Sequence, residues 1–328
     1  MIGTFKANIP YNNFFLFLYA LVIRVPSLLY SAVPHSVDGD GVIYTALLNW
    51  LKTGNESIYW YPVISLVLVY IQALSINRIV NRQRLFPKSH YLTGMSYLLI
   101  TALFPDWYVL SAAMLVNTLM IWVWSKLMGL GNDMRPKSTL FNLGFILSAT
   151  TFFYNPTFAF FILIIMGLSI SRPFKAAEWV IVCIGLATPF YFYLSWLYLT
   201  DRWAAFQWPR FGFYLKHFQD SNWVYSGLAL AVFTTCLGIY FVQSNMRRQV
   251  VQTRKSWHIL YLYLVTAMLI PFLTAVTGFG HRILVAVPLS VFISAAFFYP
   301  EKKFFPQLIH WALFLVALLT GLYNNFNF

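Results

Sequence analysis

The sequence has few charged residues, even fewer acidic residues and almost no cysteine. It contains nine Asp and Glu and 22 Lys and Arg in 328 residues, so 9% of the chain is charged, whereas a soluble domain has about 25%. Its two cysteines, Cys183 and Cys236, exclude a disulfide framework and a cysteine-based metal site. It also has no P-loop, dinucleotide-binding fingerprint, internal repeat or low-complexity linker. These absences argue against a soluble protein and against the common nucleotide-binding folds.

Long apolar runs dominate the chain instead. Apolar residues make up 60% of it and the mean hydropathy is +0.67. Runs of about twenty apolar residues are typical of transmembrane helices, so the sequence predicts an all-α polytopic membrane protein with about eleven spans, within a range of about 10–12. It forms one integral-membrane domain over residues 1–328. The predicted spans are residues 13–33, 58–76, 91–105, 107–125, 139–154, 157–171, 177–199, 223–243, 257–278, 283–299 and 307–324.

The basic residues predict an orientation, because cytoplasmic loops are enriched in Lys and Arg. The two alternating sets of loops hold sixteen and five basic residues, and Arg24 lies inside the first span. The set with sixteen is then cytoplasmic. This predicts a multi-pass protein of a bacterial inner membrane with a cytoplasmic N-terminus and a periplasmic C-terminus. The net charge of +13 is then a topology signal and argues against a nucleic-acid partner.

Two aspartates stand close together in the first predicted outer loop. Asp38 and Asp40 are flanked by Gly39 and Gly41. One interpretation is turn chemistry, since Asp and Gly favour tight turns and Asp caps a following helix. The other is function, in which the pair binds a divalent cation or one carboxylate acts as a base. The later ligands of an EF-hand are missing, and the spacing alone leaves both interpretations open.

A short amphipathic helix is predicted directly after these aspartates. Ile43, Leu47, Trp50 and Leu51 fall on one face at helical spacing, and Gly54 ends the pattern. A helix of about twelve residues is too short to span a membrane. Such a helix, with Trp and Lys at its polar boundary, is expected to lie along the membrane surface.

Several cations are candidates for binding a lipid phosphate or headgroup. His281 and Arg282 begin the tenth predicted span on the outer side, where they suit an anionic headgroup or act as interfacial anchors. Arg210 and Lys216 lie among aromatic residues in a second outer segment, a mixture that belongs at the headgroup level. Arg24 is an intramembrane charge, which indicates either a functional site or a structural partner.

These features resemble the integral-membrane glycosyltransferases of the C-type fold, which take sugars from polyprenyl-phosphate donors. The shared features are an Asp pair that leads into a surface helix and a later outer His-Arg before an aliphatic-Pro-aliphatic helix. The resemblance implies that Asp38 or Asp40 is the base or a metal-linked acid. It implies a second carboxylate in Asp106, for which a helix cap is the alternative. It also implies a phosphate clamp made of Arg210, Lys216, His281 and Arg282. The opening segment, MIGTFKANIPYNNF, is similar to uncharacterised multi-pass inner-membrane proteins of Bacteroidota.

The sequence therefore favours a membrane glycosyltransferase-like enzyme whose partners are the lipid bilayer and a polyprenyl-phosphate sugar. A non-enzymatic accessory or scaffold subunit of an envelope-biogenesis or export complex is the alternative. The aromatic content of 20% would then serve helix packing and contacts with other membrane proteins. A transporter would need polar groups at mid-membrane and broken helices, whereas most acids here lie at the predicted mouths.

Overall fold

The computed structural model describes residues 2–29, 33–51, 57–203, 212, 222–273, 279–302 and 304–326. Within these ranges the chain is helical and has no strand; a single isolated β-bridge joins Asp40 to Tyr154. In chain order the elements are α1 (Ile2–Lys6), α2 (Asn12–Ile23), α3 (Val25–Leu29), α4 (Val42–Leu51), α5 (Ser57–Arg82), α6 (Leu92–Thr101), η1 (Pro105–Trp107), α7 (Ala112–Gly129), η2 (Leu130–Asn132), α8 (Pro136–Thr151), η3 (Asn155–Phe160), α9 (Phe161–Ser171), α10 (Ala176–Leu199), α11 (Asn222–Met246), α12 (Val251–Leu269), η5 (Ile270–Leu273), η6 (Gly280–Val285), α13 (Ala286–Phe298) and α14 (Phe304–Phe326).

Seven helices of the described part are long and apolar enough to cross a membrane. They lie at Trp60–Arg82, Ala112–Asn132, Ala176–Leu199, Asn222–Met246, Val251–Leu273, Gly280–Phe298 and Phe304–Leu322. The other ranges predicted as spans hold shorter helices: α2 with α3, α6, α8, and η3 with α9. The structure therefore shows a polytopic helical membrane protein in which several helices are shorter than a bilayer requires on their own.

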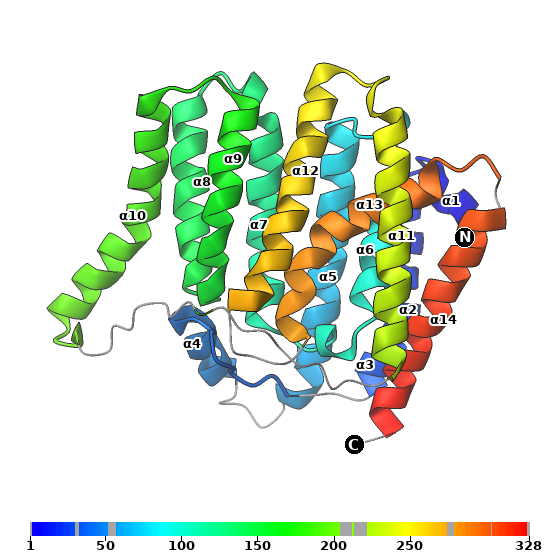
Figure 1. Ribbon diagram of the computed structural model, residues 1–328. Helices are drawn as coiled ribbons and strands as arrows, with labels where there is room; N and C mark the ends of the chain where they lie inside the picture. The colour runs from blue at the N-terminus through cyan, green and yellow to red at the C-terminus, as the bar shows by residue number, and fades with distance from the viewer. Residues whose placement is uncertain are drawn as a thin grey trace.

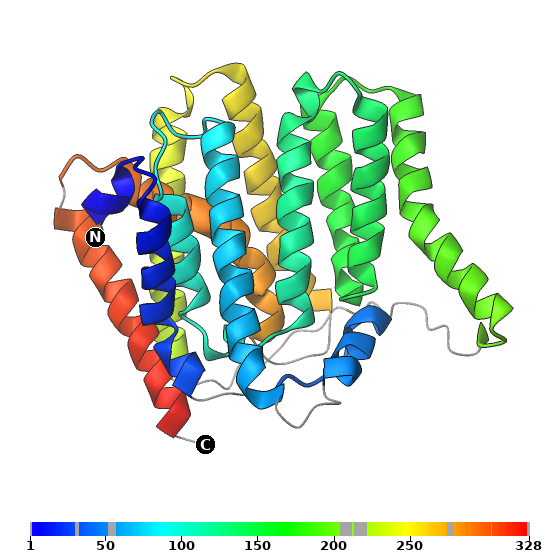
Figure 2. The same ribbon diagram turned by 180° about the vertical axis from the view of Figure 1, so that it is seen from behind.

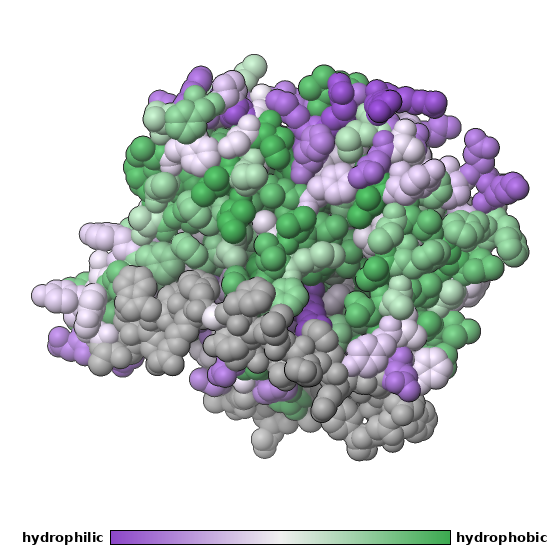
Figure 3. All heavy atoms as spheres, viewed as in Figure 1, coloured by the Kyte–Doolittle hydropathy of each residue, from purple (hydrophilic) through white to green (hydrophobic). Residues whose placement is uncertain are grey.

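The connections between helices separate into two ends of the bundle. The turns that join α5 to α6 and α11 to α12 lie at one end, while α4 and the C-terminus lie at the other (Figure 1). On the face shown in Figure 3, hydrophilic residues gather at the first end and an apolar belt crosses the middle of the molecule. We call these the basic end and the α4 end. The two sets of loops that the sequence distinguished by charge thus lie on opposite sides of the belt.

Helix α13 forms the centre of the bundle. Of the span that contains it, 89% is buried, and it packs against α6, α11, α12 and α14. Small residues allow this close packing: a Cβ atom on Gly238 of α11 would lie 1.9 Å from the carbonyl oxygen of Phe292 in α13. The two backbones therefore touch at a point where only glycine fits.

Helix α10, in contrast to α13, is mostly exposed. Only 17% of its span is buried, and its half beyond Pro189 leans away from the other helices (Figures 1 and 2). Its close contact is with α8, where Gly144 and Gly185 bring the two backbones together. Most of the surface of α10 is thus available to lipid or to another membrane protein.

Helix α4 lies across the α4 end and is too short to span, as the sequence predicts. Tyr44 and Leu48 are buried against the protein, whereas Ile43 and Trp50 are 44% and 75% exposed. Of the predicted apolar face, Ile43 and Trp50 thus point away from the bundle, whereas Leu47 and Leu51 are half-buried and Leu51 packs against the core. An outward apolar face is what a helix at the membrane surface requires.

Candidate functional site

The turn that contains Asp38 and Asp40 is held by main-chain hydrogen bonds to the turn between α8 and η3. Because both partners are backbone groups, the contact fixes the path of the chain and leaves the side chains free for other roles. The bonds run from Gly41 N to Phe153 O (2.8 Å), from Ile43 N to Phe152 O (2.9 Å) and from Asn155 N to Gly39 O (2.8 Å).

Both glycines of this turn are required by its geometry. Gly39 has a φ of 97°, which side-chain-bearing residues rarely adopt. A Cβ atom on Gly41 would lie 2.1 Å from the carbonyl oxygen of Phe152. The turn-forming interpretation of the Asp-Gly-Asp-Gly sequence therefore holds for the glycines, and the roles of the two aspartates have to be judged separately.

The two aspartates have different environments. Asp38 is exposed, whereas Asp40 is partly buried. Asp40 Oδ2 accepts the N–H of Val37 at 2.9 Å, while its Oδ1 is buried and has no hydrogen-bond partner among the described residues. Burial raises the pKa of Asp40 to about 6, against the smaller opposing effects of the Val37 N–H and of His35. Of the two, Asp40 is the carboxylate placed to accept a proton near neutral pH.

Tyr154 connects Asp40 to His281. Its backbone pairs with that of Asp40, and its ring stacks on the His281 imidazole with centroids 4.7 Å apart and planes at 3°. His281 is 7% exposed. We call Asp40, Tyr154 and His281 the Asp40 cluster. The structure thus brings together two predicted site residues that are far apart in the chain, through a tyrosine that sequence reasoning missed.

Asp106 and Trp107 hold the start of η6. Asp106 Oδ2 accepts the N–H of Phe279 at 2.8 Å, and the Trp107 indole N–H donates to the carbonyl oxygen of Phe279 at 2.7 Å. Asp106 itself is exposed. Its carboxylate therefore positions the segment that carries His281 and Arg282, which is a supporting contact for the site.

Arg282 contacts a different set of residues from His281. Its guanidinium lies 4.2 Å from the centroid of the Phe279 ring, and it lines an apolar cavity beside α11 and α12. His281, its neighbour in the chain, contacts Tyr154 instead. The two members of the His-Arg pair, which the sequence treats as one clamp, thus have different contacts.

Arg24 is part of the framework at the α4 end. It is 1% exposed and donates to Ser65 Oγ (3.1 Å), Thr101 O (3.3 Å) and Trp107 O (3.2 Å). Its guanidinium also lies 5.4 Å from the Tyr108 ring. These contacts join the break between α2 and α3 to α5, α6 and η1, which accounts for an intramembrane charge by a structural role.

The other predicted components of the site are the basic side chains Arg210 and Lys216 and a bound divalent cation. Arg210 and Lys216 lie outside the described residues. For a divalent cation at Asp38 and Asp40, no group of three or more His, Cys, Asp or Glu side chains gathers within the ranges that the structure describes. A cation at this turn would therefore depend on the Asp40 carboxylate and on main-chain oxygens.

The fold and the site define a class: a polytopic helical membrane protein with a polar cluster at one end of its bundle. Residues 42–326 match the model of a protein family that is described as a family of unknown function (DUF6427). The protein belongs to this family. The match begins at Val42, directly after the Asp40 turn. Comparison with curated proteins and with solved structures gives no match.

Proposed function

We propose that the protein is a glycosyltransferase-like enzyme of a bacterial inner membrane that uses a lipid-linked sugar donor. The α4 end faces the periplasm in this proposal, and the basic end, with the N-terminus, faces the cytoplasm. The orientation rests on the uneven distribution of Lys and Arg between the two sets of loops. The proposed donor is a polyprenyl-phosphate sugar, and the acceptor is a hydroxyl group that approaches from the periplasmic side.

The observation that carries the proposal is the state of Asp40. Its pKa of about 6 is closer to neutral pH than that of an ordinary aspartate, and a general base is most effective when its pKa lies near the operating pH. Its Oδ1 atom is buried without a hydrogen-bond partner among the described residues. Several other buried side-chain atoms of the described residues also have no hydrogen-bond partner, but among the predicted carboxylates this is so only of Asp40, and the proposal assigns its Oδ1 to a water or to the acceptor hydroxyl.

The proposed reaction assigns roles to Asp40, His281 and Arg282. Asp40 accepts the proton of the acceptor hydroxyl as that oxygen forms a bond to the anomeric carbon. The bond from this carbon to the phosphate oxygen breaks at the same time, and polyprenyl phosphate leaves as an anion. Arg282 is the cation that the described structure offers to the leaving phosphate. His281 stacks on Tyr154, whose backbone pairs with that of Asp40.

Transfer should depend on pH as Asp40 ionises. Because its pKa is raised to about 6, the carboxylate is mostly protonated at pH 5 and mostly ionised at pH 7. We expect the initial rate to rise about tenfold per pH unit below the pKa and to level off above it. The measurement uses protein in liposomes at pH 4.5–8 with polyprenyl-phosphate glucose, mannose and galactose as donors and an envelope extract as acceptor. A rate that is constant between about pH 5 and 7 would contradict the role of Asp40.

A second function, an accessory subunit of an envelope complex, is favoured by helix α10. Tyr191, Phe192 and Tyr198 are each more than 60% exposed on its outer half, where the helix leaves the bundle. Tyr and aromatic residues of this kind are enriched at contacts between proteins. If no donor in the panel is turned over, while loss of the protein still blocks envelope assembly in cells, this second function replaces the first.

A further inference from the structure

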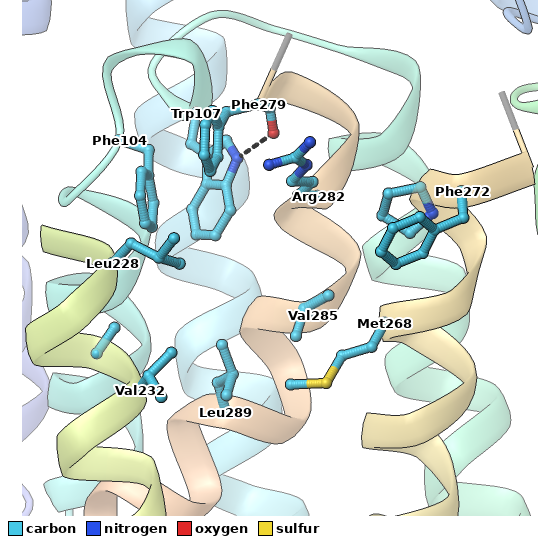
Figure 4. A pocket seen from close by; sticks show the side chains of 12 residues that line it. Phe104, Trp107, Leu228, Val232, Met268, Phe272, Phe279, Arg282, Val285 and Leu289 are labelled. Carbon is cyan, nitrogen blue, oxygen red and sulfur yellow. Dashed lines mark hydrogen bonds between the residues drawn. The ribbon is translucent and has the colours of Figure 1, made fainter. Parts of the chain in front are cut away.

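An apolar cavity of about 290 Å³ lies between α11, the junction of α12 with η5, and the segment from η6 to α13. Leu228 and Val232 line it from α11, and Met268 from α12. Among the described residues that line it, Arg282 is the one with a charge. Figure 4 shows Arg282 at the same end of the cavity as Trp107 and Phe279, whereas Val232, Met268 and Leu289 lie at the other end.

The cavity opens towards the surface that faces the membrane. Val232 and Met268 line it and are 52% and 44% exposed. Both belong to helices that are long and apolar enough to cross a bilayer. The space between them is therefore reached from lipid, and an apolar chain enters without passing through water. The far end of the same space meets η6, which also carries His281 of the Asp40 cluster.

We propose that this cavity binds a lipid phosphate monoester with a single hydrocarbon chain, and that Arg282 binds the phosphate. The apolar walls fit the chain, and a guanidinium at the end fits phosphate oxygens because its planar fork donates two hydrogen bonds. A volume of about 290 Å³ is at the lower limit of the roughly 300–1,000 Å³ of small-molecule sites. It admits part of one hydrocarbon chain, and a phospholipid would have to leave its second chain outside the cavity.

This inference deepens the proposed function, because it names the donor side of the same site. It also separates the roles of two neighbours in the chain: Arg282 serves the lipid phosphate, and His281 serves the Asp40 cluster. Binding can be measured without any transfer reaction, so the two proposals can fail independently. In particular, Asp40→Asn should bind the lipid phosphate with wild-type affinity.

The test measures equilibrium binding of radiolabelled farnesyl phosphate and of farnesol to the purified full-length protein in nanodiscs. We expect Arg282→Gln to weaken binding of farnesyl phosphate by roughly 10- to 100-fold, the range for hydrogen bonds to a charged group, and to leave farnesol binding within about twofold. Arg202→Gln is the matched control, because Arg202 is an exposed arginine at the end of α10, away from the cavity lining.

A second pair of variants tests the cavity itself. Val232→Trp fills the membrane-facing end and should weaken binding of both ligands, whereas Ala187→Trp, at an exposed position on α10, should weaken neither. The proposal is overturned if wild-type protein shows no saturable binding, or if Arg282→Gln and Arg202→Gln bind farnesyl phosphate equally. It is also overturned if dioleoyl phosphatidylglycerol displaces farnesyl phosphate at equal concentration, since the site would then take ordinary two-chain lipids.

Discussion

Asp40→Asn is expected to lower sugar transfer by roughly 10²- to 10⁴-fold, the contribution of a general base. Asparagine has nearly the same shape, and its amide oxygen still accepts the Val37 N–H that Oδ2 accepts now. The variant should therefore fold normally. Burial disfavours the charged form of Asp40 and raises its pKa, so at pH 7 the neutral amide should make the folded state slightly more stable. Initial rates in liposomes and thermal unfolding of the same samples measure both effects.

Two other carboxylates of the α4 end, Asp38 and Asp106, provide the controls. Asp38→Asn changes an exposed side chain in the same turn, and we expect transfer within about threefold of wild type, because an exposed surface change seldom has a larger effect. Asp106→Asn keeps an oxygen that accepts the Phe279 N–H and should retain most of the activity. Full transfer by Asp40→Asn would show that Asp40 is not the base. Loss of transfer by Asp38→Asn alone would show that Asp38 is the base instead.

Gly238→Ala is expected to destabilise the protein by about 3 kcal/mol or more, at the upper end of the cost of overpacking a core. The added methyl group would lie 1.9 Å from the Phe292 carbonyl oxygen. This neighbour is backbone in a buried helix, so no side chain can rotate away. Helices α11 and α13 must move apart along their contact. The melting temperature in detergent and the folded fraction after size-exclusion chromatography measure the effect.

Gly227 offers a matched control on the same helix. A Cβ atom there would have its nearest neighbour, Val316 Cγ1, at 3.6 Å, which is ordinary contact. Gly227→Ala should be neutral or stabilise by up to about 1 kcal/mol, because alanine has the higher helix propensity. Equal melting temperatures for the two variants would show that α11 and α13 are packed less closely than the structure has them.

The class of the protein and the positions of its helices could be predicted because hydrophobicity dominates both. A run such as 58–76 has to become a buried or lipid-facing helix, and it lies inside α5. The short helix after Asp40 was predicted for the same reason, from the spacing of Ile43, Leu47 and Trp50. Which face packs on the protein was not predictable, because Tyr44 and Leu48 offer a second apolar face.

The composition of the site was only partly predictable. Tyr154 lies at the end of a predicted span and carries no charge, so nothing in the sequence marks it. Its contact with Asp40 is a pairing of backbone groups. Such a pairing does not depend on residue type, so the sequence does not predict it. The sequence left open whether Arg24 binds substrate or a structural partner. Its partners include the carbonyl oxygens of Thr101 and Trp107, and any residue type supplies a carbonyl.

The enclosed position of α13 has a consequence for how the protein is made. This helix begins at Ala286, near the end of the chain, yet it packs against α6, α11 and α12, all of which are synthesised earlier. As the chain enters the membrane from its N-terminus, those helices stand in the bilayer before the helix between them exists. Until then, the faces of α6, α11 and α12 that pack on α13 are covered by lipid or by one another. The centre of the bundle is thus completed only when α13 enters and displaces these neighbours.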